Sequence, residues 1–217
     1  MNILHEDQHI IVCIKPPEVV SEQTADKTGF ADLLAMHTGT YIGVIHRLDR
    51  GVGGIMVYAK TPHAAKVLSQ AVQERRLQKE YYAIVHGLLE MPSGSMQDLL
   101  FHDRRQNKTF VVERDRAGVK KAILDYETRS TQEIAPYGPL SLVRVTLHTG
   151  RTHQIRVQFA SRAHALLGDG KYGASGDRCP IALFSSHLAF PHPVSGKPMD
   201  FTAVPTGEIW SFFRDAI

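Results

Sequence analysis

The sequence predicts an α+β protein with a mixed, mostly antiparallel central sheet flanked by helices and loops. Short apolar runs typical of strands recur along the chain, and the few helical patterns do not alternate with them strictly, as they would in βαβ proteins. Of the 217 residues, 43% are hydrophobic and 22% are charged, which excludes a disordered chain, a collagen-like repeat and a coiled coil. At this length we expect a single domain over residues 1–217.

Apolar periodicity predicts the elements in the first part of the chain. Residues 9–14 form an apolar run that predicts a buried strand, and a Pro-Pro pair ends it because proline lacks a backbone donor. Residues 30–37 place apolar side chains on one helical face. A Thr-Pro dipeptide, suited to the N-cap and first position of a helix, begins a second helix over residues 61–76. Further strands are expected at residues 41–45, 55–59 and 81–85.

The second part of the chain predicts more strands than helices. Residues 140–148 alternate between apolar and polar side chains, as a strand does. Gly150 permits a sharp turn after them, and Thr152 is expected to cap a helix in which Ile155 and Phe159 pack inward. Further strands are expected at residues 123–128, 183–190 and 199–203, and a short helix at 209–213.

The net positive charge is small, but the basic residues are concentrated in one segment of the chain. The formal net charge is only +3, which fits a nucleic-acid partner but also simple solubility. Residues 101–121 hold seven basic side chains against three acidic ones. Two interpretations of this segment stay open: a solvated hairpin, and an arm that contacts RNA phosphates.

Cysteine usage and apolar runs predict a reduced, cytoplasmic protein. Cys13 and Cys179 lie far apart and match neither a disulfide framework nor a zinc-knuckle spacing. The first residues lack the features of a signal peptide, and no apolar run approaches the roughly 18 residues of a membrane span. Histidine pairs spaced five apart, such as His148 and His153, do not place two ligands on one helix face, so no metal is expected.

The most suggestive chemistry lies in a glycine-rich turn at residues 46–54, His-Arg-Leu-Asp-Arg-Gly-Val-Gly-Gly. Asp49 stands between Arg47 and Arg50, whose positive charges favour an ionised carboxylate. Two interpretations fit the motif alone: an acid that caps the turn and pairs with Arg50, and a functional acid. The His-Arg-Asp loop of protein kinases is excluded, because no glycine-rich nucleotide loop or Asp-Phe-Gly motif accompanies it.

Two further clusters carry side chains that could act on a substrate. Tyr81 and Tyr82 are adjacent in a predicted strand, so one faces the core while the other can offer its ring to a base. Residues 149–156, Thr-Gly-Arg-Thr-His-Gln-Ile-Arg, place Arg151 and Arg156 near a helix N-terminus, which suits a phosphate or a buried carboxylate. Each cluster alone also fits a packed strand and a solvated helix start.

Together these segments resemble the RluA family of pseudouridine synthases over nearly the whole chain. The family's motifs are an acidic opening followed by Lys-Pro, then His-Arg-Leu-Asp, Lys-x-Tyr-x-Ala, Gly-Arg-Thr-His-Gln-Ile-Arg, Gly-Asp-x-x-Tyr-Gly and His-Pro-x-x-Gly. They occur here in that order, at residues 5–16, 46–49, 79–83, 150–156, 168–173 and 192–196. Six ordered matches are far more specific than any single one.

The resemblance implies an isomerase that converts uridine to pseudouridine in ribosomal or transfer RNA, without a cofactor or a metal. It implies Asp49 as the catalytic acid or nucleophile, Tyr81 as the family tyrosine, and Arg156 as the partner of the catalytic carboxylate. The reaction breaks the N1–C1′ bond, turns the uracil over and joins C5 to the same sugar. The carboxylate could attack the sugar, attack the ring or remove a sugar proton, and all three routes stay open.

The resemblance also implies residues that hold the substrate. Arg47 is expected to help displace the target base, because it is long, planar and cationic and can fill the gap that a flipped base leaves. Leu183 is expected to lie against the base, and Arg151 to bind substrate. We expect RNA as the partner, no membrane, a monomer, and a compact catalytic domain without an S4-like RNA-binding domain.

Several positions depart from the family pattern, and they leave the identity of the substrate open. Val52 and Gly53 stand where Thr and Ser are common, Gln158 and Phe184 stand where His is common, and residues 17–18 (Pro-Glu) replace a small residue and a glycine. Two other functions are kept as alternatives. One is an RNA-binding or RNA-folding factor whose catalysis is dispensable, and the other is a glycoside hydrolase, which would normally need two carboxylates.

Overall fold

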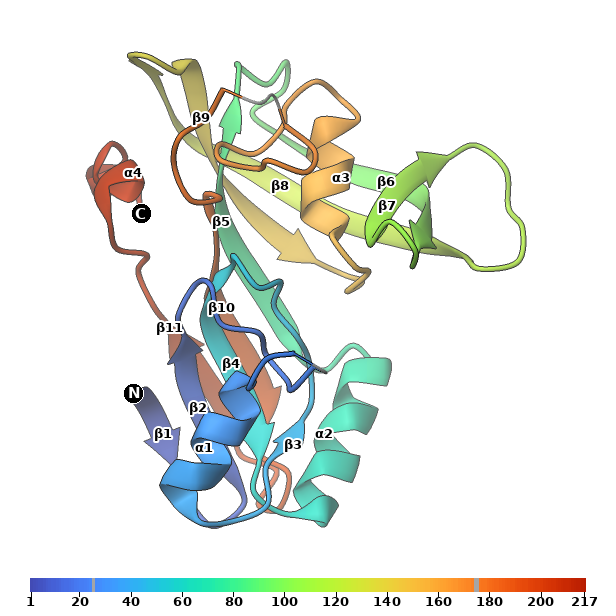
Figure 1. Ribbon diagram of the computed structural model, residues 1–217, viewed down its shortest axis with the longest axis vertical. Coiled ribbons are helices and arrows are strands. Elements are labelled where there is room, and N and C mark those ends of the chain that lie inside the picture. The colour runs from blue at the N-terminus through green and yellow to red at the C-terminus, as the bar shows by residue number, and fades with distance from the viewer. Residues whose placement is uncertain (25, 174–175) are drawn as a thin grey trace. The chain divides into compact units, whose positions relative to one another are not determined.

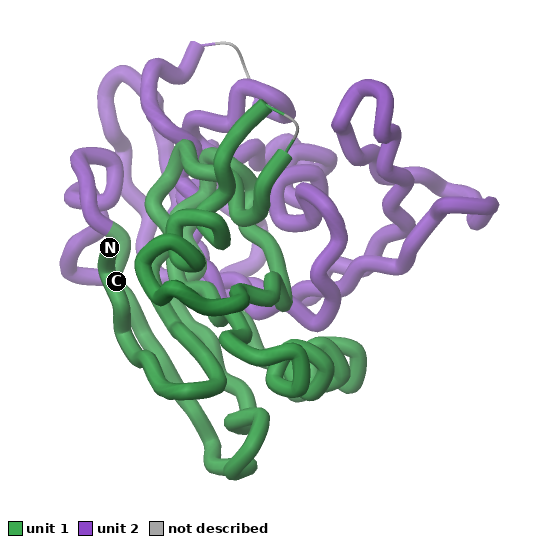
Figure 2. Tube along the Cα trace, turned by 60° about the horizontal axis from the view of Figure 1, so that its bottom comes forward, with its two compact units in different colours: residues 1–79, 184–205 green, residues 80–183, 206–217 purple. Residues whose placement is uncertain are grey.

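The computed structural model describes residues 1–24, 26–173 and 176–217, and it divides the chain into two compact units (Figures 1 and 2). Unit 1 comprises residues 1–79 and 184–205, and unit 2 comprises residues 80–183 and 206–217. Each unit is therefore assembled from segments that lie far apart in the sequence. The fold is a mixed, mostly antiparallel α+β arrangement, which confirms the predicted class.

Unit 1 is built on a mixed sheet in which, among the described residues, β4 and β10 form the parallel pair. β1, β2 and β4 are successive antiparallel neighbours, and β3 pairs with β4. β10 joins β4 in parallel at Phe184 and Ser185, and β11 pairs with β10 in antiparallel fashion. The strands are β1 (Asn2–Glu6), β2 (Ile10–Lys15), β3 (Gly43–Val44), β4 (Gly53–Ala59), β10 (Leu183–Pro191) and β11 (Pro198–Thr202).

Two helices accompany the sheet of unit 1, α1 (Phe30–Thr38) and α2 (Pro62–Gln73). The predicted cap of α2 is confirmed, since the side chain of Thr61 accepts a hydrogen bond from the backbone N–H of Ala64 at 3.1 Å. Ala64 of α2 packs in one buried cluster with Ile55 and Val57 of β4. All seven positions of β4 are buried, which explains why its sequence is almost wholly apolar.

The parallel contact between β4 and β10 depends on the absence of a side chain at Gly54. Gly54 has a φ of +128°, which L-residues with a side chain rarely adopt. A Cβ at this position would lie 2.4 Å from the backbone nitrogen and oxygen of Ser185. The two strands can therefore approach only with glycine here.

Unit 2 contains a wholly antiparallel sheet in the order β5-β9-β8-β6-β7. Its longest strand, β8, has a bulge between Thr128 and Ser130 and extends well beyond the predicted residues 123–128. The strands are β5 (Gln78–His86), β6 (Ser93–Asp103), β7 (Lys108–Val112), β8 (Val119–Ile134) and β9 (Gly138–Leu147).

The helices of unit 2 are short: α3 (Gln154–Ala160), α4 (Glu208–Ser211) and a 3₁₀ turn at Arg214–Ala216. Ile155 and Phe159 of α3 are buried, as predicted, and Val157 on another side of the helix packs on Leu100 of β6 and Ala122 of β8. In the parts of the chain that the structure describes, no helix is both long enough and apolar enough to span a bilayer.

The basic segment at residues 101–121, which we call the arm, forms the end of β6, a tight turn, β7, a loop and the start of β8. The predicted hairpin is thus present, and Figure 1 shows it at the outer end of unit 2 (yellow-green). Whether the arm contacts RNA stays a prediction at this point.

The predicted cap of the helix after Gly150 is wrong. His153, not Thr152, occupies the N-cap, with a left-handed φ of 54° and no side-chain cap bond. The side chain of Gln154 organises the turn instead. Its Oε1 accepts hydrogen bonds from Arg151 N at 3.0 Å and from Thr149 Oγ1 at 2.8 Å.

Gly54→Ala should lower the free energy of unfolding by about 3 kcal/mol, because the added Cβ combines a steric clash with a strained φ. Gly196→Ala is the matched control, since its φ is +69° but a Cβ there would have no atom within 4 Å. The control should lose only about 1–2 kcal/mol from backbone strain. Urea unfolding measures both losses, and equal losses would contradict the argument from close strand approach.

Candidate active site

The predicted site residues are divided between the two units. Asp49 and Arg47 belong to unit 1, and Tyr81, Arg156 and Leu183 belong to unit 2, together with Arg151.

Residues 15–22 hold the backbone of the turn that carries Asp49. The hydroxyl of Ser21 donates to the carbonyl oxygen of Leu48 at 2.8 Å and accepts from the Leu48 N–H at 3.0 Å. On the other side of Asp49, Nζ of Lys15 donates to the carbonyl oxygen of Arg50 at 3.3 Å. The residues that flank Asp49 on both sides are thus fixed by buried polar groups.

Lys15 brings a buried positive charge close to Asp49. Its side chain is fully buried, and Nζ also donates to the carbonyl oxygen of Val19 at 2.7 Å. Burial lowers the pKa of Lys15 to about 8, although the negative charges of Asp49 and Glu18 oppose this shift. At neutral pH the turn therefore has a cation beneath it, in a position to offset the charge of a carboxylate.

The two arginines beside Asp49 contact acids of the same segment 15–22. Arg47 forms an ion pair with Glu22, and Nη2 of Arg50 lies 2.7 Å from a carboxylate oxygen of Glu18. All four side chains are well exposed, and exposed ion pairs of this kind contribute only about 0–1 kcal/mol. A phosphate or a nucleobase could therefore displace them at little cost.

Glu18 adopts a conformation that explains why the family has a glycine here. Its φ is +66°, in the left-handed region that costs a non-glycine residue roughly 1–2 kcal/mol. The carboxylate of Glu18 pairs with Arg50, and its carbonyl oxygen accepts a hydrogen bond from Arg50 Nε at 3.3 Å. The departure from the family pattern thus adds one side-chain contact to Arg50, since a glycine also has the carbonyl oxygen.

Two other departures lie side by side in the structure. Gly53 and Phe184 are register partners in the parallel β4–β10 pair, and a Cβ on Gly53 would meet the Phe184 ring at 3.5 Å. Glycine, in place of the usual Ser, therefore faces the ring of Phe184, which is bulkier than the usual His. Gln158 is fully buried, and its Nε2 donates to Asp98 at 2.6 Å, which ties α3 to β6.

Arg156 of unit 2 is anchored by a buried carboxylate. Its Nε and Nη2 each donate to an oxygen of Asp169 at 2.8 Å, in a two-pronged ion pair. The Asp169 side chain is fully inaccessible, and it also accepts from the backbone N–H of Lys171 at 3.0 Å and of Tyr172 at 3.2 Å. Burial would raise the pKa of Asp169, but these bonds and the charge of Arg156 outweigh it and hold the pKa below its usual value.

Asp169 is a site residue that sequence reasoning missed. It lies in the Gly-Asp-x-x-Tyr-Gly motif, so a signal was present, but Arg156 and Asp169 are 13 residues apart and no helical or strand spacing links them. The glycine of the motif has a clear structural role. A Cβ on Gly168, whose φ is +75°, would lie 2.3 Å from the carbonyl oxygen of Pro180.

The other predicted residues of unit 2 differ in how far they are exposed. Tyr81 of β5 is buried whereas Tyr82 is partly exposed, which confirms that the two rings occupy opposite faces. Leu183 is buried at the first position of β10. Arg151 is exposed, but its Nε donates to the carbonyl oxygen of Lys121 at 3.0 Å, so its stem is tied to β8.

His46, which opens the turn at residues 46–54, is held neutral inside unit 1. Its Nε2 accepts a hydrogen bond from the backbone N–H of Val57 at 3.3 Å, and Nδ1 has no hydrogen-bond partner among the described residues. Burial, with a smaller effect from the charge of Lys79, lowers the pKa of His46 to about 3. A neutral ring whose Nδ1 carries the proton fits this environment.

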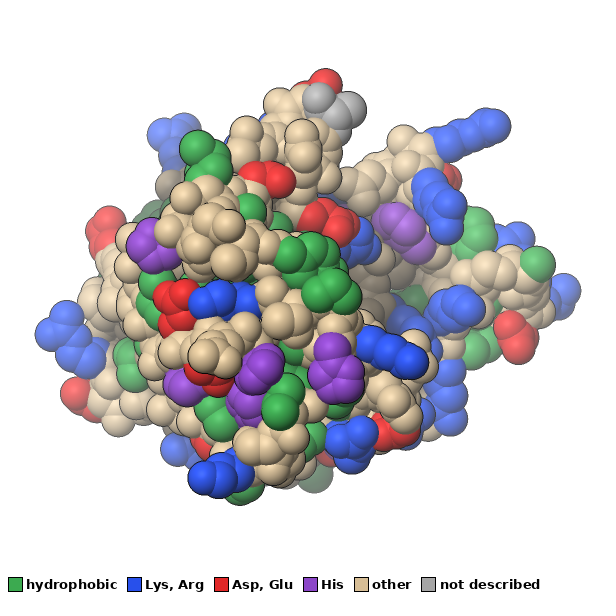
Figure 3. Space-filling model, turned by 90° about the horizontal axis from the view of Figure 1, so that it is seen from below, with side chains coloured by type: hydrophobic (Ala, Val, Ile, Leu, Met, Phe, Trp, Pro, Cys, Tyr) green, Lys and Arg blue, Asp and Glu red, His purple; other side chains and the backbone are tan. Residues whose placement is uncertain are grey.

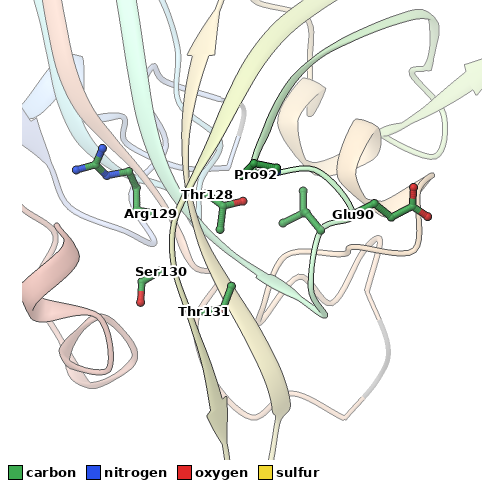
Figure 4. Close-up of a pocket in the computed structure, with 7 residues that line it drawn as sticks. Glu90, Pro92, Thr128, Arg129, Ser130 and Thr131 are labelled. Carbon is green, nitrogen blue, oxygen red and sulfur yellow. The ribbon is translucent and has the colours of Figure 1, made fainter.

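An open hollow of about 290 Å³ in unit 2 contains none of the predicted site residues (Figure 4). It is lined by residues of β8, including the bulged Arg129, and by the segment that precedes β6, including Glu90 and Pro92. Figure 4 shows the side chains of Arg129 and Glu90 directed away from each other, so these two charged groups do not converge on one ligand position.

Comparison with known proteins gives one consistent family. A family model described as RNA pseudouridylate synthase matches residues 9–161. An uncharacterized RNA pseudouridine synthase of Aquifex aeolicus is 33% identical over 93% of this chain and 68% of its own. Ribosomal large subunit pseudouridine synthase D of Zymomonas mobilis is 32% identical over 99% of this chain and 72% of its own. The enzyme of that name from Vibrio cholerae is 36% identical over 94% of this chain and 67% of its own.

Solved structures give the same fold. Human RNA Pseudouridylate Synthase Domain Containing 1 matches with a TM-score of 0.78, covering 94% of this chain and 83% of its own. Human RNA Pseudouridylate Synthase Domain Containing 4 matches with a TM-score of 0.77, covering 98% of this chain and 92% of its own. Both are 21% identical in sequence, so they support the architecture and no more than that.

The burial of neutral His46 predicts a pH-dependent stability. Between about pH 6.5 and 3 the unfolded chain binds a proton at His46 that the folded chain does not, so the free energy of unfolding should fall as pH falls. The slope due to this residue approaches about 1.4 kcal/mol per pH unit. The pKa values of Asp7 and Asp169 are lowered in the folded chain. These two residues therefore reduce the free energy of unfolding further only when the pH falls to about 4, the usual pKa of Asp, and below.

His46→Gln should flatten that slope. Urea unfolding of the wild type and the variant at about pH 4.5, 5.2 and 6 measures the difference, because both proteins share every carboxylate and differ only at residue 46. Parallel slopes in the two proteins would contradict the assignment of the effect to His46.

Proposed function

The chain belongs to the RluA-type RNA pseudouridylate synthase family, and on this premise we propose that it modifies specific uridines in ribosomal or transfer RNA. Members of the family isomerise uridine to pseudouridine in RNA, so the chain is an isomerase that acts on RNA. The observation that carries the choice of RNA is the similarity, over 94–99% of this chain, to enzymes named ribosomal large subunit pseudouridine synthase D. Ribosomal RNA is therefore the first substrate to test.

Asp49 is the proposed catalytic acid or nucleophile. Support comes from the turn that carries it, because Ser21 and Lys15 hold the backbone on either side of Asp49. The buried charge of Lys15 supplies a compensating cation. Cleavage of the N1–C1′ bond needs a carboxylate that acts on the sugar or on the ring. Joining C1′ to C5 releases the C5 hydrogen as a proton, and N1 takes up a proton, so the composition of the nucleoside is unchanged.

Arg156 and Tyr81 are the proposed partners of Asp49 in catalysis. The two-pronged pair with Asp169 supports this role for Arg156, because it fixes the plane of the guanidinium group. Arg47 is proposed to displace the target base, and its weak, exposed ion pair with Glu22 would be exchanged for RNA. Leu183 and Arg151 are proposed to hold the substrate.

We further propose that both units work together as one catalytic domain over residues 1–217, and that the protein is a monomer in the cytoplasm. Two free cysteines, Cys13 and Cys179, agree with a reducing compartment. Light scattering of the purified protein at micromolar concentration tests the monomer, since a dimer would double the measured mass.

The arm is proposed to contact RNA phosphates. Figure 3 shows many Lys and Arg side chains and few acidic ones on the side of the molecule where Figure 1 has the β6–β7 hairpin. Arg104 and Arg105 lie in the turn of this hairpin and are exposed. Long-range attraction of this kind would supply affinity without sequence information.

Asp49→Ala should abolish pseudouridine formation while RNA affinity stays within about twofold, because the charge removed is small beside the phosphate contacts. Tritium release from ribosomal RNA labelled at uridine C5 measures turnover, and filter binding measures affinity. Asp215→Ala, which removes an exposed carboxylate in the C-terminal turn, is the control and should keep full activity. Residual isomerisation by Asp49→Ala would refute the assignment, and release of free uracil by the wild type would indicate a hydrolase.

Changing Arg104, Arg105 and Lys108 to Gln should weaken RNA binding. It should also reduce the slope of log K against log salt by about 0.7–0.9 for each phosphate that the arm no longer neutralises. The same change at the exposed residues Lys66, Lys197 and Arg214 is the matched control and should leave the slope almost unaltered. An unchanged slope in the arm variant would show that the arm is only a solvated hairpin.

A further inference from the structure

The turn at residues 168–173 contacts both Arg156 and the arm, and none of the proposed roles accounts for this double contact. On one side, Asp169 of the turn holds the guanidinium group of Arg156. On the other side, Nζ of Lys171 donates to the carbonyl oxygen of Asn107, at the tip of the arm, at 2.6 Å. A displacement of the arm therefore acts directly on the turn that fixes Arg156.

Tyr172 makes the most direct connection between the two. Its hydroxyl accepts a hydrogen bond from the backbone N–H of Thr109 in β7 at 2.7 Å and also bonds with Nδ1 of His153, at the N-cap of α3, at 2.8 Å. β7 is an edge strand, so its outward donors lack a strand partner, and the Tyr172 hydroxyl satisfies one of them. Burial raises the pKa of Tyr172, which keeps the hydroxyl protonated.

Thr109 anchors the other end of this connection. It is only 1% exposed, although it lies in a strand whose neighbouring positions Phe110 and Val111 are exposed. Its Oγ1 donates to the carbonyl oxygen of Thr152 at 2.9 Å, directly before α3. β7 is thus attached to the segment that leads into α3 and to Tyr172 by two bonds from a single buried residue.

The ring of Tyr172 also lies against both cations. The guanidinium carbon of Arg156 is 5.2 Å from the ring centroid, and Nζ of Lys108 in the arm is 5.4 Å from the same centroid. One aromatic ring therefore contacts a cation of the arm and the cation proposed for catalysis. An anion that binds Lys108 would alter the interactions of the same ring.

We propose that Tyr172 is a positioning residue that couples the arm to Arg156, so that engagement of RNA phosphates by the arm sets the orientation of the Arg156 guanidinium. The coupling rests on the proposed function, since it gives Arg156 and the arm their roles. It makes turnover depend on arm contacts even when RNA is saturating. A ring that serves only to fill space would make no such link.

A double-mutant cycle tests the coupling on kcat at saturating ribosomal RNA. The arm variant carries Arg104→Gln and Arg105→Gln, which spare Lys108 and every hydrogen bond of Tyr172. In an otherwise wild-type chain it should lower kcat about tenfold, whereas in a Tyr172→Phe chain it should lower kcat less than twofold. The Kd for RNA should rise by the same factor in both backgrounds. Equal losses of kcat in the two backgrounds would overturn the proposal.

Tyr126→Phe is the matched control for the loss of a hydroxyl. Tyr126 belongs to β8 of the same unit, and its ring packs edge-on against Phe159 of α3 at 5.8 Å. In the Tyr126→Phe chain the arm variant should lower kcat about tenfold, as in the wild type. Thermal unfolding of each variant confirms that it is folded, and Thr109→Val, which removes only the side-chain bonds at the other end, should weaken the coupling in the same direction.

A second readout requires no turnover. The Nε–H of Arg156, which donates to Asp169, gives an NMR signal that should shift when oligouridine binds the wild type and stay unshifted in Tyr172→Phe. No shift in the wild type at saturating oligouridine would overturn the coupling. A shift in a wild type that forms no pseudouridine would instead refute the proposed function alone, so the two failures are distinguishable.

Discussion

The buried ion pair between Arg156 and Asp169 is the interaction on which the organisation of unit 2 depends. A carboxylate that is fully inaccessible to water needs a cation and hydrogen-bond donors, and Asp169 receives two bonds from Arg156 and two from backbone N–H groups. Loss of either partner in such a pair typically costs about 3–5 kcal/mol, because the other charge is left buried. The turn at residues 168–173 must therefore keep its shape, and Gly168 is required for that shape.

In unit 1, hydrogen bonds to the backbone hold the turn around Asp49. The turn around Asp49 is held by Ser21 and Lys15, both of which are buried and act on carbonyl oxygens or N–H groups. The exposed arginines on either side have acidic partners that water can replace. The backbone is thus held while the ion pairs of Arg47 and Arg50 can be exchanged at little cost, which suits the proposed contact of this loop with RNA.

Sequence patterns predicted the elements whose physical cause is local. β2 and β4 are continuous apolar runs because they are buried, and the start of α2 follows from the chemistry of Thr61 and Pro62. β1 and much of β6 escaped prediction, because their exposed positions carry mixed side chains without a clear period. The cap predicted at Thr152 is wrong because the N-cap is His153, which makes no side-chain cap bond, while the side-chain amide of Gln154 folds back and binds the turn before the helix.

The candidate site, like the fold, could be predicted from the sequence only in part. Asp49, Tyr81 and Arg156 could be named from motifs, but their roles came from resemblance, and the motifs did not reveal what holds them. Asp169 and Tyr172 act through contacts between residues far apart in the sequence, such as the bond from Thr109 N to the Tyr172 hydroxyl. Contacts of this kind follow from the path of the chain in space, which spacing along the sequence does not record.

Three departures from the family pattern lie in packed positions, whereas Glu18 adds a charged side chain that pairs with Arg50. Gly53 faces Phe184 across a strand pair, so a smaller residue on β4 accompanies a larger one on β10, and volume is roughly conserved. Gln158 stands where the family has a histidine, and its Nε2 donates to Asp98 of β6. These exchanges alter the packing between β4 and β10 and between α3 and β6, and Gln158 Oε1 is left without a hydrogen-bond partner among the described residues, while Arg156 keeps its two-pronged pair with Asp169. Differences in the preferred RNA are therefore expected to arise from packing around the residues proposed for catalysis.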